Sequence, residues 1–232
     1  ATVLDTRNLS DSEVIIYVMI AVALCLIILQ LALDSYLAPV LMLLNIGMAV
    51  LYNMGTNAFL GQTSYITKAI SAVLQLGVTM DFAIFLYHSY KAEKEKASNN
   101  DEAMATAIAK TLVSVLGSSL TTIAGFLALC SMNLTLGKDI GLVMAKGVLI
   151  GVITAVTTLP AMLLVFDKWV EKTKHKEILP RFEKVKNFNL KHYKAILVAF
   201  IVILPFAVYG YTHTQVYYNL DSSLPEALER VS

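Results

Sequence analysis

The sequence predicts an all-α integral membrane protein with six transmembrane helices. Of its 232 residues 57% are hydrophobic and only 15% are charged, and the mean hydropathy is +0.67. In a typical soluble domain, about a quarter of the residues are charged. The apolar residues also gather in runs near the roughly 20-residue length of a helical span. There are six such runs, at residues 14–33, 36–59, 66–90, 112–132, 140–166 and 195–212.

The first runs are close together along the chain. Only Asp34 and Ser35 separate the first run from the second, so these two spans are expected to form a tight hairpin. The fifth run, 140–166, is longer than a perpendicular helix needs, which predicts a tilt or an extension beyond the bilayer. Cys25 and Cys130 lie inside apolar runs, where a disulfide between them is not expected.

The segment 99–110 predicts a short amphipathic helix at the membrane surface, leading into the fourth span. Asn100 is its expected N-cap, and Asp101 and Glu102 fall in the first turn, where negative charge is favourable. The later segment 168–194 is rich in lysine and is interrupted by Pro180. It predicts a basic connector whose lysines lie near anionic lipid headgroups.

The distribution of Lys and Arg predicts the orientation. Cytoplasmic loops are enriched in these residues. One side of the membrane holds thirteen Lys and Arg residues and the other side holds four, while Lys146 lies inside a span. Both ends of the chain are therefore expected to be external, in a multi-pass protein of the cell membrane. The thirteen are Lys91, Lys94, Lys96, Lys110, Lys168, Lys172, Lys174, Lys176, Arg181, Lys184, Lys186, Lys191 and Lys194, and the four are Arg7, Lys68, Lys138 and Arg230.

The third run contains an unusual charge, Asp81, within LQLGVTMDFAIFLYHSY. An ionisable residue inside a span costs at least about 2.5–3.5 kcal/mol and is a functional candidate by default. A low dielectric disfavours the charged form, so the carboxyl can take up and release a proton; the alternative is a structural hydrogen bond to a neighbouring helix. Gly77, Phe85 and His88 share its helical face.

Other side chains have two interpretations each. Ser119 and Thr122 either hydrogen-bond Asp81 or satisfy carbonyls of their own helix. His88 either passes protons to the cytoplasm or extends to the interface. Lys146 either pairs with a carboxylate outside this sequence or extends outward. Glycines at the spacing GxxxG, Gly147 and Gly151, predict close helix packing.

The motif around Asp81 resembles the fourth-helix motif of the resistance–nodulation–division (RND) superfamily, and in particular its MMPL (mycobacterial membrane protein large) branch. Gly77 and Asp81 match that motif, the segment 91–93 resembles its basic-acidic exit, and Phe82 stands where the family usually has Tyr. GSSLTTIAGFLAL (117–129) is similar to the fifth helix. KDIGLVMAKGVLIGVITAVTTLPAML (138–163) is similar to the sixth.

The resemblance implies a domain organisation. Family members usually have twelve spans in two repeats, so this chain corresponds to helices two to seven, a central fragment. Residues 1–13 then end the first external domain, 14–167 form a five-helix bundle that includes 99–110, and 168–194 form the connector. Residues 195–212 begin the second repeat and 213–232 begin the second external domain.

The resemblance also implies a function. It predicts export of lipids or other hydrophobic compounds, driven by a proton gradient and needing no cofactor, metal or catalytic residue. Asp81, Phe82 and His88 would form the proton relay, supported by Gly77, Ser119, Thr122 and Lys146. The expected partners are membrane lipids, a hydrophobic substrate and the second repeat, helices eight to twelve; homo-oligomerisation stays open.

Two non-exporting functions remain as alternatives. Helices two to six correspond to a sterol- or lipid-sensing domain, and a protein-translocation accessory subunit shares the helix order. The latter has a Phe-Asp-Arg exit, whereas residues 87–91 read YHSYK. The sequence contains neither HExxH nor a Walker A motif, so we expect no enzyme, and a net charge of +1 gives no indication of nucleic-acid binding.

Overall fold

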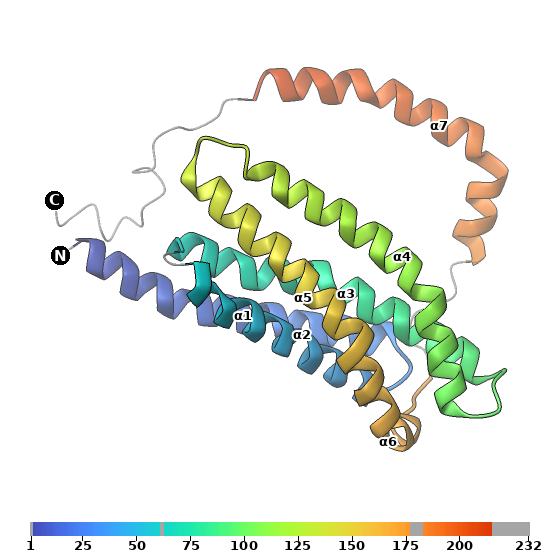
Figure 1. The fold of residues 1–232 in the computed structure, drawn as a ribbon. Helices are drawn as coiled ribbons and strands as arrows, with labels where there is room; N and C mark the ends of the chain where they lie inside the picture. Colours follow the sequence, from blue (N-terminus) through green and yellow to red (C-terminus); the bar gives the residue numbers. More distant parts are fainter. Residues whose placement is uncertain (1, 61–62, 177–182, 215–232) are drawn as a thin grey trace. The chain divides into compact units, whose positions relative to one another are not determined.

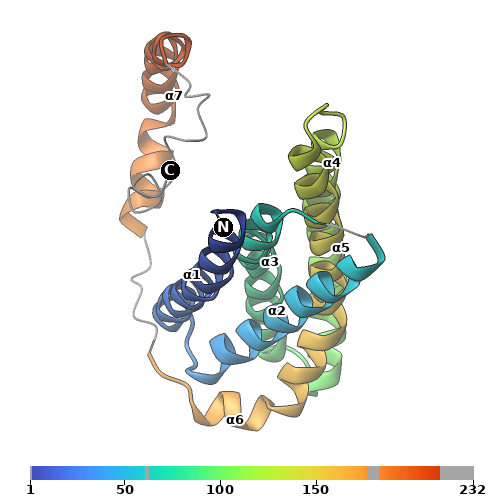
Figure 2. The ribbon, with the colours of Figure 1, turned by 90° about the vertical axis from the view of Figure 1, so that its left-hand side faces the viewer.

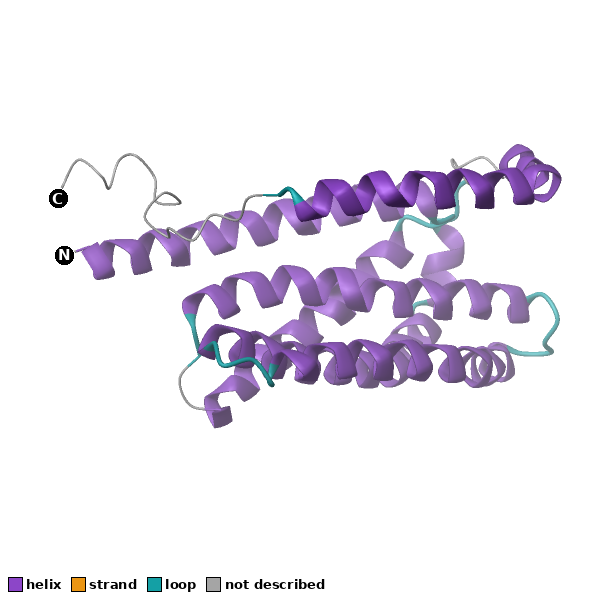
Figure 3. Ribbon diagram, turned by 90° about the horizontal axis from the view of Figure 1, so that it is seen from above, coloured by secondary structure: helices purple, strands orange, loops and turns teal. Residues whose placement is uncertain are grey.

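The computed structural model describes residues 2–60, 63–176 and 183–214, and all named elements in them are helical (Figures 1 and 3). One compact unit holds the elements up to α6, and a second holds α7. In chain order they are α1 (Thr2–Ala32), α2 (Leu37–Thr56), the short 3-10 helix η1 (Asn57–Leu60), α3 (Tyr65–Lys94), α4 (Asn100–Leu129), α5 (Thr135–Val165), α6 (Asp167–Lys172) and α7 (Glu183–Thr212).

The predicted all-α membrane architecture is confirmed. In a bilayer the backbone must satisfy its own hydrogen bonds, so long apolar runs become helices. Within the described residues five helical stretches are long and apolar enough to cross a membrane, and Ile16–Ala32 in α1 is a shorter apolar stretch. The five are Leu37–Phe59, Ile66–Lys94, Asn100–Leu129, Thr135–Val165 and Asn187–Thr212.

The predicted surface helix 99–110 needs correction in two respects. It is not a separate element, because α4 runs without a break from Asn100 to Leu129. Its N-cap is Asn99, not Asn100: Asn99 has an extended backbone (φ −150°, ψ 165°), and its side chain accepts the Glu102 N–H at 2.8 Å. Adjacent asparagines offer the same chemistry, and the backbone conformation decides between them.

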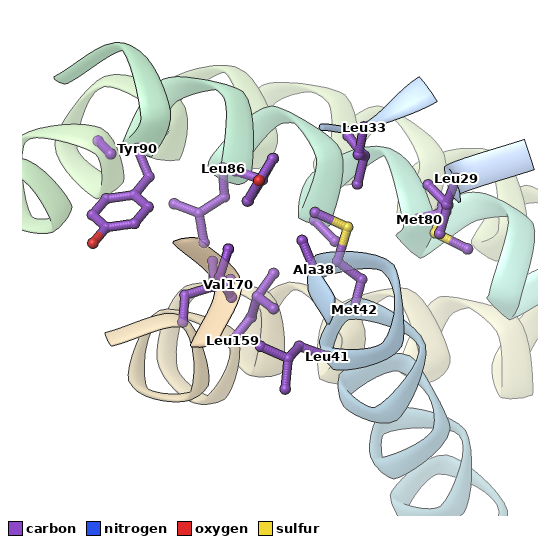
Figure 4. Packing of buried hydrophobic residues seen from close by; sticks show 14 of the residues in the cluster. Leu29, Leu33, Ala38, Leu41, Met42, Met80, Leu86, Tyr90, Leu159 and Val170 are labelled. Carbon is purple, nitrogen blue, oxygen red and sulfur yellow. The ribbon is translucent and has the colours of Figure 1, made fainter. Parts of the chain in front are cut away.

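Helix α5 is central to the first unit, since it contacts α2, α3 and α4. A buried apolar cluster joins Leu29 of α1, and Leu33 just after it, to Met42 of α2, Leu86 of α3 and Leu159 of α5 (Figure 4). The predicted GxxxG packing is confirmed, because a Cβ atom at Gly147 would lie 2.5 Å from Asn53 Nδ2 and one at Gly151 would overlap the Thr79 side chain. Only glycine allows α5 to approach α2 and α3 this closely.

The second unit contains α7 alone among the described elements. The helix includes the predicted span 195–212 but begins earlier, at Glu183. Its backbone is non-helical at His192, where the helix is kinked, and Pro205 lies in its apolar part. The predicted break at Pro180 lies outside the described residues, as does 215–232 of the expected external segment.

Candidate functional site

Asp81 lies near the middle of α3, on a face that the first unit leaves uncovered. Gly77, Asp81, Phe85 and His88 are all exposed, and Phe85 is 62% exposed. The predicted sharing of one face is therefore confirmed. Among the described residues the Asp81 carboxylate has no hydrogen-bond or ion-pair partner.

The surroundings of Gly77 show how open this face is. A Cβ atom at Gly77 would meet nothing within 4 Å. The adjoining helix α4 is also largely uncovered, with Val113 77% and Leu120 65% exposed. Ionisable residues in spans almost always face protein or water rather than lipid, so this surface is suited to a covering protein element.

Three predicted site residues make no hydrogen bond to Asp81 in the described part of the chain. Phe82 is 4% exposed and belongs to an apolar cluster with Val115 and Val148. Ser119 donates its hydroxyl to the Val115 carbonyl, and Thr122 donates to the Ser118 carbonyl at 2.9 Å. The two hydroxyls are therefore bonded within their own helix.

The opposite face of α3 carries a buried polar row that sequence reasoning missed. Gln75 connects three helices: Asn53 Nδ2 of α2 donates to its Oε1 at 2.8 Å, and its Nε2 donates to the Gly147 carbonyl of α5 at 3.1 Å. Four-residue spacing is the sequence signal, since it puts polar groups on one helical face. The row consists of Thr67, Ser71, Gln75 and Thr79, each at most 2% exposed.

Lys146 extends from α5 to the end of α2. Its Nζ donates to the Asn53 carbonyl at 2.9 Å, to Thr56 Oγ1 at 2.9 Å and to Asn57 Oδ1 at 2.6 Å. Neither predicted alternative named this contact. The ammonium is held by neutral oxygens at the C-terminal end of a helix, where the dipole favours a cation.

Two carboxylates anchor the C-terminal end of α3, on the predicted cytoplasmic side. Lys91 Nζ lies 2.8 Å from Asp34 Oδ2, and the Tyr87 hydroxyl donates to Asp34 Oδ1 at 2.9 Å. Burial opposes ionisation of Asp34, but the hydrogen bonds from Lys91 and Tyr87 and the Lys91 charge outweigh it, so the pKa of Asp34 lies below its ordinary value.

Asp167 is the second anchor and was not singled out from the sequence. Its carboxylate accepts from Lys94 Nζ at 2.6 and 2.7 Å, from the Tyr90 hydroxyl at 2.9 Å and from Asn100 Nδ2 at 2.8 Å. This carboxylate joins α3, α4 and α6. Nearby, Lys110 Nζ donates to Glu93 Oε1 at 2.8 Å and ties α4 to α3 again.

These contacts define what the unit can do chemically. Neutral polar groups and paired carboxylates fix helix positions, while Asp81 alone among these groups offers an unpaired carboxyl inside a span. Both cysteines are free and half-buried. Within the described ranges no group of three or more His, Cys, Asp or Glu residues could hold a metal ion.

Comparison with known proteins assigns the family. A family model described as "MMPL family" matches residues 1–191. The chain belongs to the MMPL family. It is therefore a multi-pass membrane protein of the RND/MMPL type, as the motif around Asp81 predicted.

Curated relatives in this family are larger than the chain. Putative membrane protein ActII-3 of Streptomyces coelicolor is 32% identical over 62% of this chain and 22% of its own length. Siderophore exporter MmpL5 of Mycobacterium tuberculosis is 26% identical over 73% of the chain and 18% of its own length. Hopanoid transporter HpnN of Rhodopseudomonas palustris is 29% identical over 56% of the chain and 15% of its own length. The chain thus matches about a fifth of the length of these MMPL relatives.

Proposed function

We propose that this chain is the central part of the membrane domain of a transporter that exports lipids or other hydrophobic compounds and is driven by the proton-motive force. Membership of the MMPL family supports transport, and two relatives carry the names siderophore exporter and hopanoid transporter. Both names refer to compounds handled at a membrane, which agrees with a hydrophobic substrate.

The observation that carries the energy coupling is the unpaired Asp81 carboxyl on the uncovered face of α3. Protonation removes its charge and so changes which surface it can pack against. In this proposal the second repeat, helices eight to twelve, covers the face that includes Gly77 and Asp81. Proton uptake and release at Asp81 then bias how the two repeats pack.

The neighbouring residues have subordinate roles in the proposal. Gly77 leaves room for a helix from the second repeat to approach. His88 lies two turns from Asp81 toward the lysine-rich side and passes protons to the cytoplasm. Phe82, buried beside Val115, fixes the rotation of α3 and carries no proton.

Infrared difference spectroscopy of the full-length protein tests the proton carrier. A protonated-carboxyl band at neutral pH, lost on alkalinisation and missing from Asp81→Asn, is the expected result. Asp101→Asn is the matched control, because Asp101 is an exposed aspartate in the first turn of α4. If the band survives in Asp81→Asn, proton coupling through this residue is wrong.

Transport measurements separate this proposal from lipid sensing. In vesicles with an imposed pH gradient, an exporter loaded with a fluorescent lipid should move it outward in wild type and not in Asp81→Asn. A sensing domain binds lipid in both proteins and moves it in neither. Gradient-independent movement by Asp81→Asn would contradict proton-driven transport.

A further inference from the structure

A groove lies where α6 meets the beginning of α2. It has a volume of about 380 Å³ and is lined by Leu37, Trp169, Lys172 and Thr173. Helix α6 sits below the first turn of α2 and the end of α5 in Figure 2. We call this groove the α2–α6 groove. It lies on the predicted cytoplasmic side.

Hydrogen bonds hold the two walls of the α2–α6 groove together. The Tyr36 N–H donates to the Thr173 carbonyl at 3.2 Å, and the His175 N–H donates to the Asp34 carbonyl at 2.8 Å. Ser35 Oγ donates to the Val170 carbonyl at 3.1 Å. The groove is therefore a fixed feature, since its walls come from segments that are directly bonded to each other.

The positive charge of Lys172 is not paired with a carboxylate of the described residues. Three other lysines of this side are paired: Lys94 with Asp167, Lys110 with Glu93 and Lys174 with Glu171. Across the described residues Lys172 has no carboxylate partner. An unpaired ammonium that lines a groove attracts an anion.

Trp169 indicates where this anion lies. Its side chain is 64% exposed on the same groove. Tryptophan is enriched at the membrane–water interface, at the level of lipid headgroups. A tryptophan and an unpaired lysine around one groove therefore fit a phosphate group of a lipid rather than a soluble anion.

A second, separate groove lies further along α2. It has a volume of about 590 Å³, lies between α1, α2 and α3, and includes Val40, Leu44, Gly47 and Leu51 in an almost wholly apolar lining. Leu37 is one turn before Val40, so both grooves share a face of α2. We call it the apolar groove.

The length of the apolar groove matches one leaflet. Val40 and Leu51 are eleven positions apart along α2, or roughly 16 Å at 1.5 Å per residue. The hydrocarbon core is about 30 Å thick, so the apolar groove extends through about half of it. An acyl chain that starts at the headgroup level would fill this length.

We infer that this face of α2 binds one anionic glycerophospholipid of the cytoplasmic leaflet. Its phosphate lies against Lys172 beside Trp169, and one acyl chain lies in the apolar groove along Val40 and Leu51. The inference uses the proposed cytoplasmic orientation of α6 but not proton transport. The lipid stays bound to the folded protein, on the side of the bundle away from the Asp81 face.

Native mass spectrometry of the delipidated full-length protein tests the headgroup contact. Titration with phosphatidylglycerol should give one tightly bound lipid, and phosphatidylcholine should bind more weakly. Lys172→Gln should weaken phosphatidylglycerol binding about fivefold, since one lysine near the surface contributes about 1 kcal/mol. Lys168→Gln is the matched control, because Lys168 is exposed on the same helix but does not line the α2–α6 groove.

A glycine pair tests the acyl-chain contact independently. A Cβ atom at Gly47 or at Gly55 would meet nothing within 4 Å, so both positions have open space for a side chain to begin. Gly47→Leu fills the apolar groove and should abolish the tightly bound lipid, whereas Gly55→Leu should retain it. Equal losses in Lys168→Gln and Lys172→Gln, equal binding of both lipids, or full binding by Gly47→Leu would each overturn the inference.

Discussion

Helix α3 has one polar face inside the bundle and another on its surface, and the two differ in chemistry. Inside, the uncharged Gln75 is bonded to Asn53 and to a backbone carbonyl of α5. On the surface, Asp81 offers an ionisable carboxyl that has no partner among the described residues. In the middle of α3, a neutral amide thus connects three helices of one unit, whereas the ionisable Asp81 lies on the face that this unit leaves uncovered.

The largest expected effect concerns the inner face. Gly151→Leu would force a side chain against Thr79 and separate α5 from α3, and overpacking of this kind costs about 3 kcal/mol. The thermal unfolding midpoint of the full-length protein measures it. Gly55→Leu, where space is open, is the control and should change the midpoint little; equal shifts would contradict tight packing at Gly151.

A smaller effect is expected from the hydrogen bonds of Gln75. Gln75→Leu leaves Asn53 Nδ2 and the Gly147 carbonyl without this partner and should cost about 1 kcal/mol, as for other hydrogen bonds between membrane helices. Denaturant unfolding of Gln75→Leu, Asn53→Leu and the double variant measures the coupling. Additive effects would show that the two amides do not act together.

The paired carboxylate Asp34 gives a pH-dependent comparison with Asp81. Because the folded pKa of Asp34 is lowered, its stabilisation is present above the ordinary value of about 3.9 and is lost as the pH falls through the folded value. The effect should stay below about 1 kcal/mol, since Lys91 is partly exposed to solvent.

Melting curves between about pH 7 and pH 3 measure this effect. Wild type should lose more stability on acidification than Asp34→Asn, because the variant has no carboxylate to protonate at that position. Identical pH profiles for the two proteins would contradict a stabilising Asp34–Lys91 pair.

Asp81→Asn should have the smallest effect on folding. With no partner among the described residues, the carboxylate contributes little to the free energy of unfolding, and the change should stay within about 0.5 kcal/mol at neutral pH. Chemical unfolding of the full-length variant measures it. A loss well above 1 kcal/mol would favour the structural interpretation of Asp81 over the relay.

Local features of the fold were predictable from the sequence. The apolar runs predicted the helices, and the interruption at Asp34 and Ser35 predicted the break between α1 and α2, because both depend on residues close in the chain. The cap of α4 was misassigned by one position, Asn100 for Asn99, since residue type alone does not fix a backbone angle.

Contacts between distant residues were not predictable in the same way. Asp167 accepts a hydrogen bond from Tyr90, 77 positions away, and Asp34 accepts one from Tyr87, 53 positions away. The buried row at Thr67, Ser71, Gln75 and Thr79 has a visible four-residue spacing. That spacing identifies a face but does not say whether the face meets protein, lipid or water.

The membrane helices, the family resemblance and the position of Asp81 on one face with Gly77 and His88 can all be predicted without a structure. These follow from the length of apolar runs and from helical geometry, which are local properties. The positions of Gln75 inside the bundle and of Asp81 on its uncovered side become known only from the packed helices. The reason is physical: burial depends on which helices pack against α3, and that packing is set by residues far along the chain, such as Gly147 and Gly151 of α5.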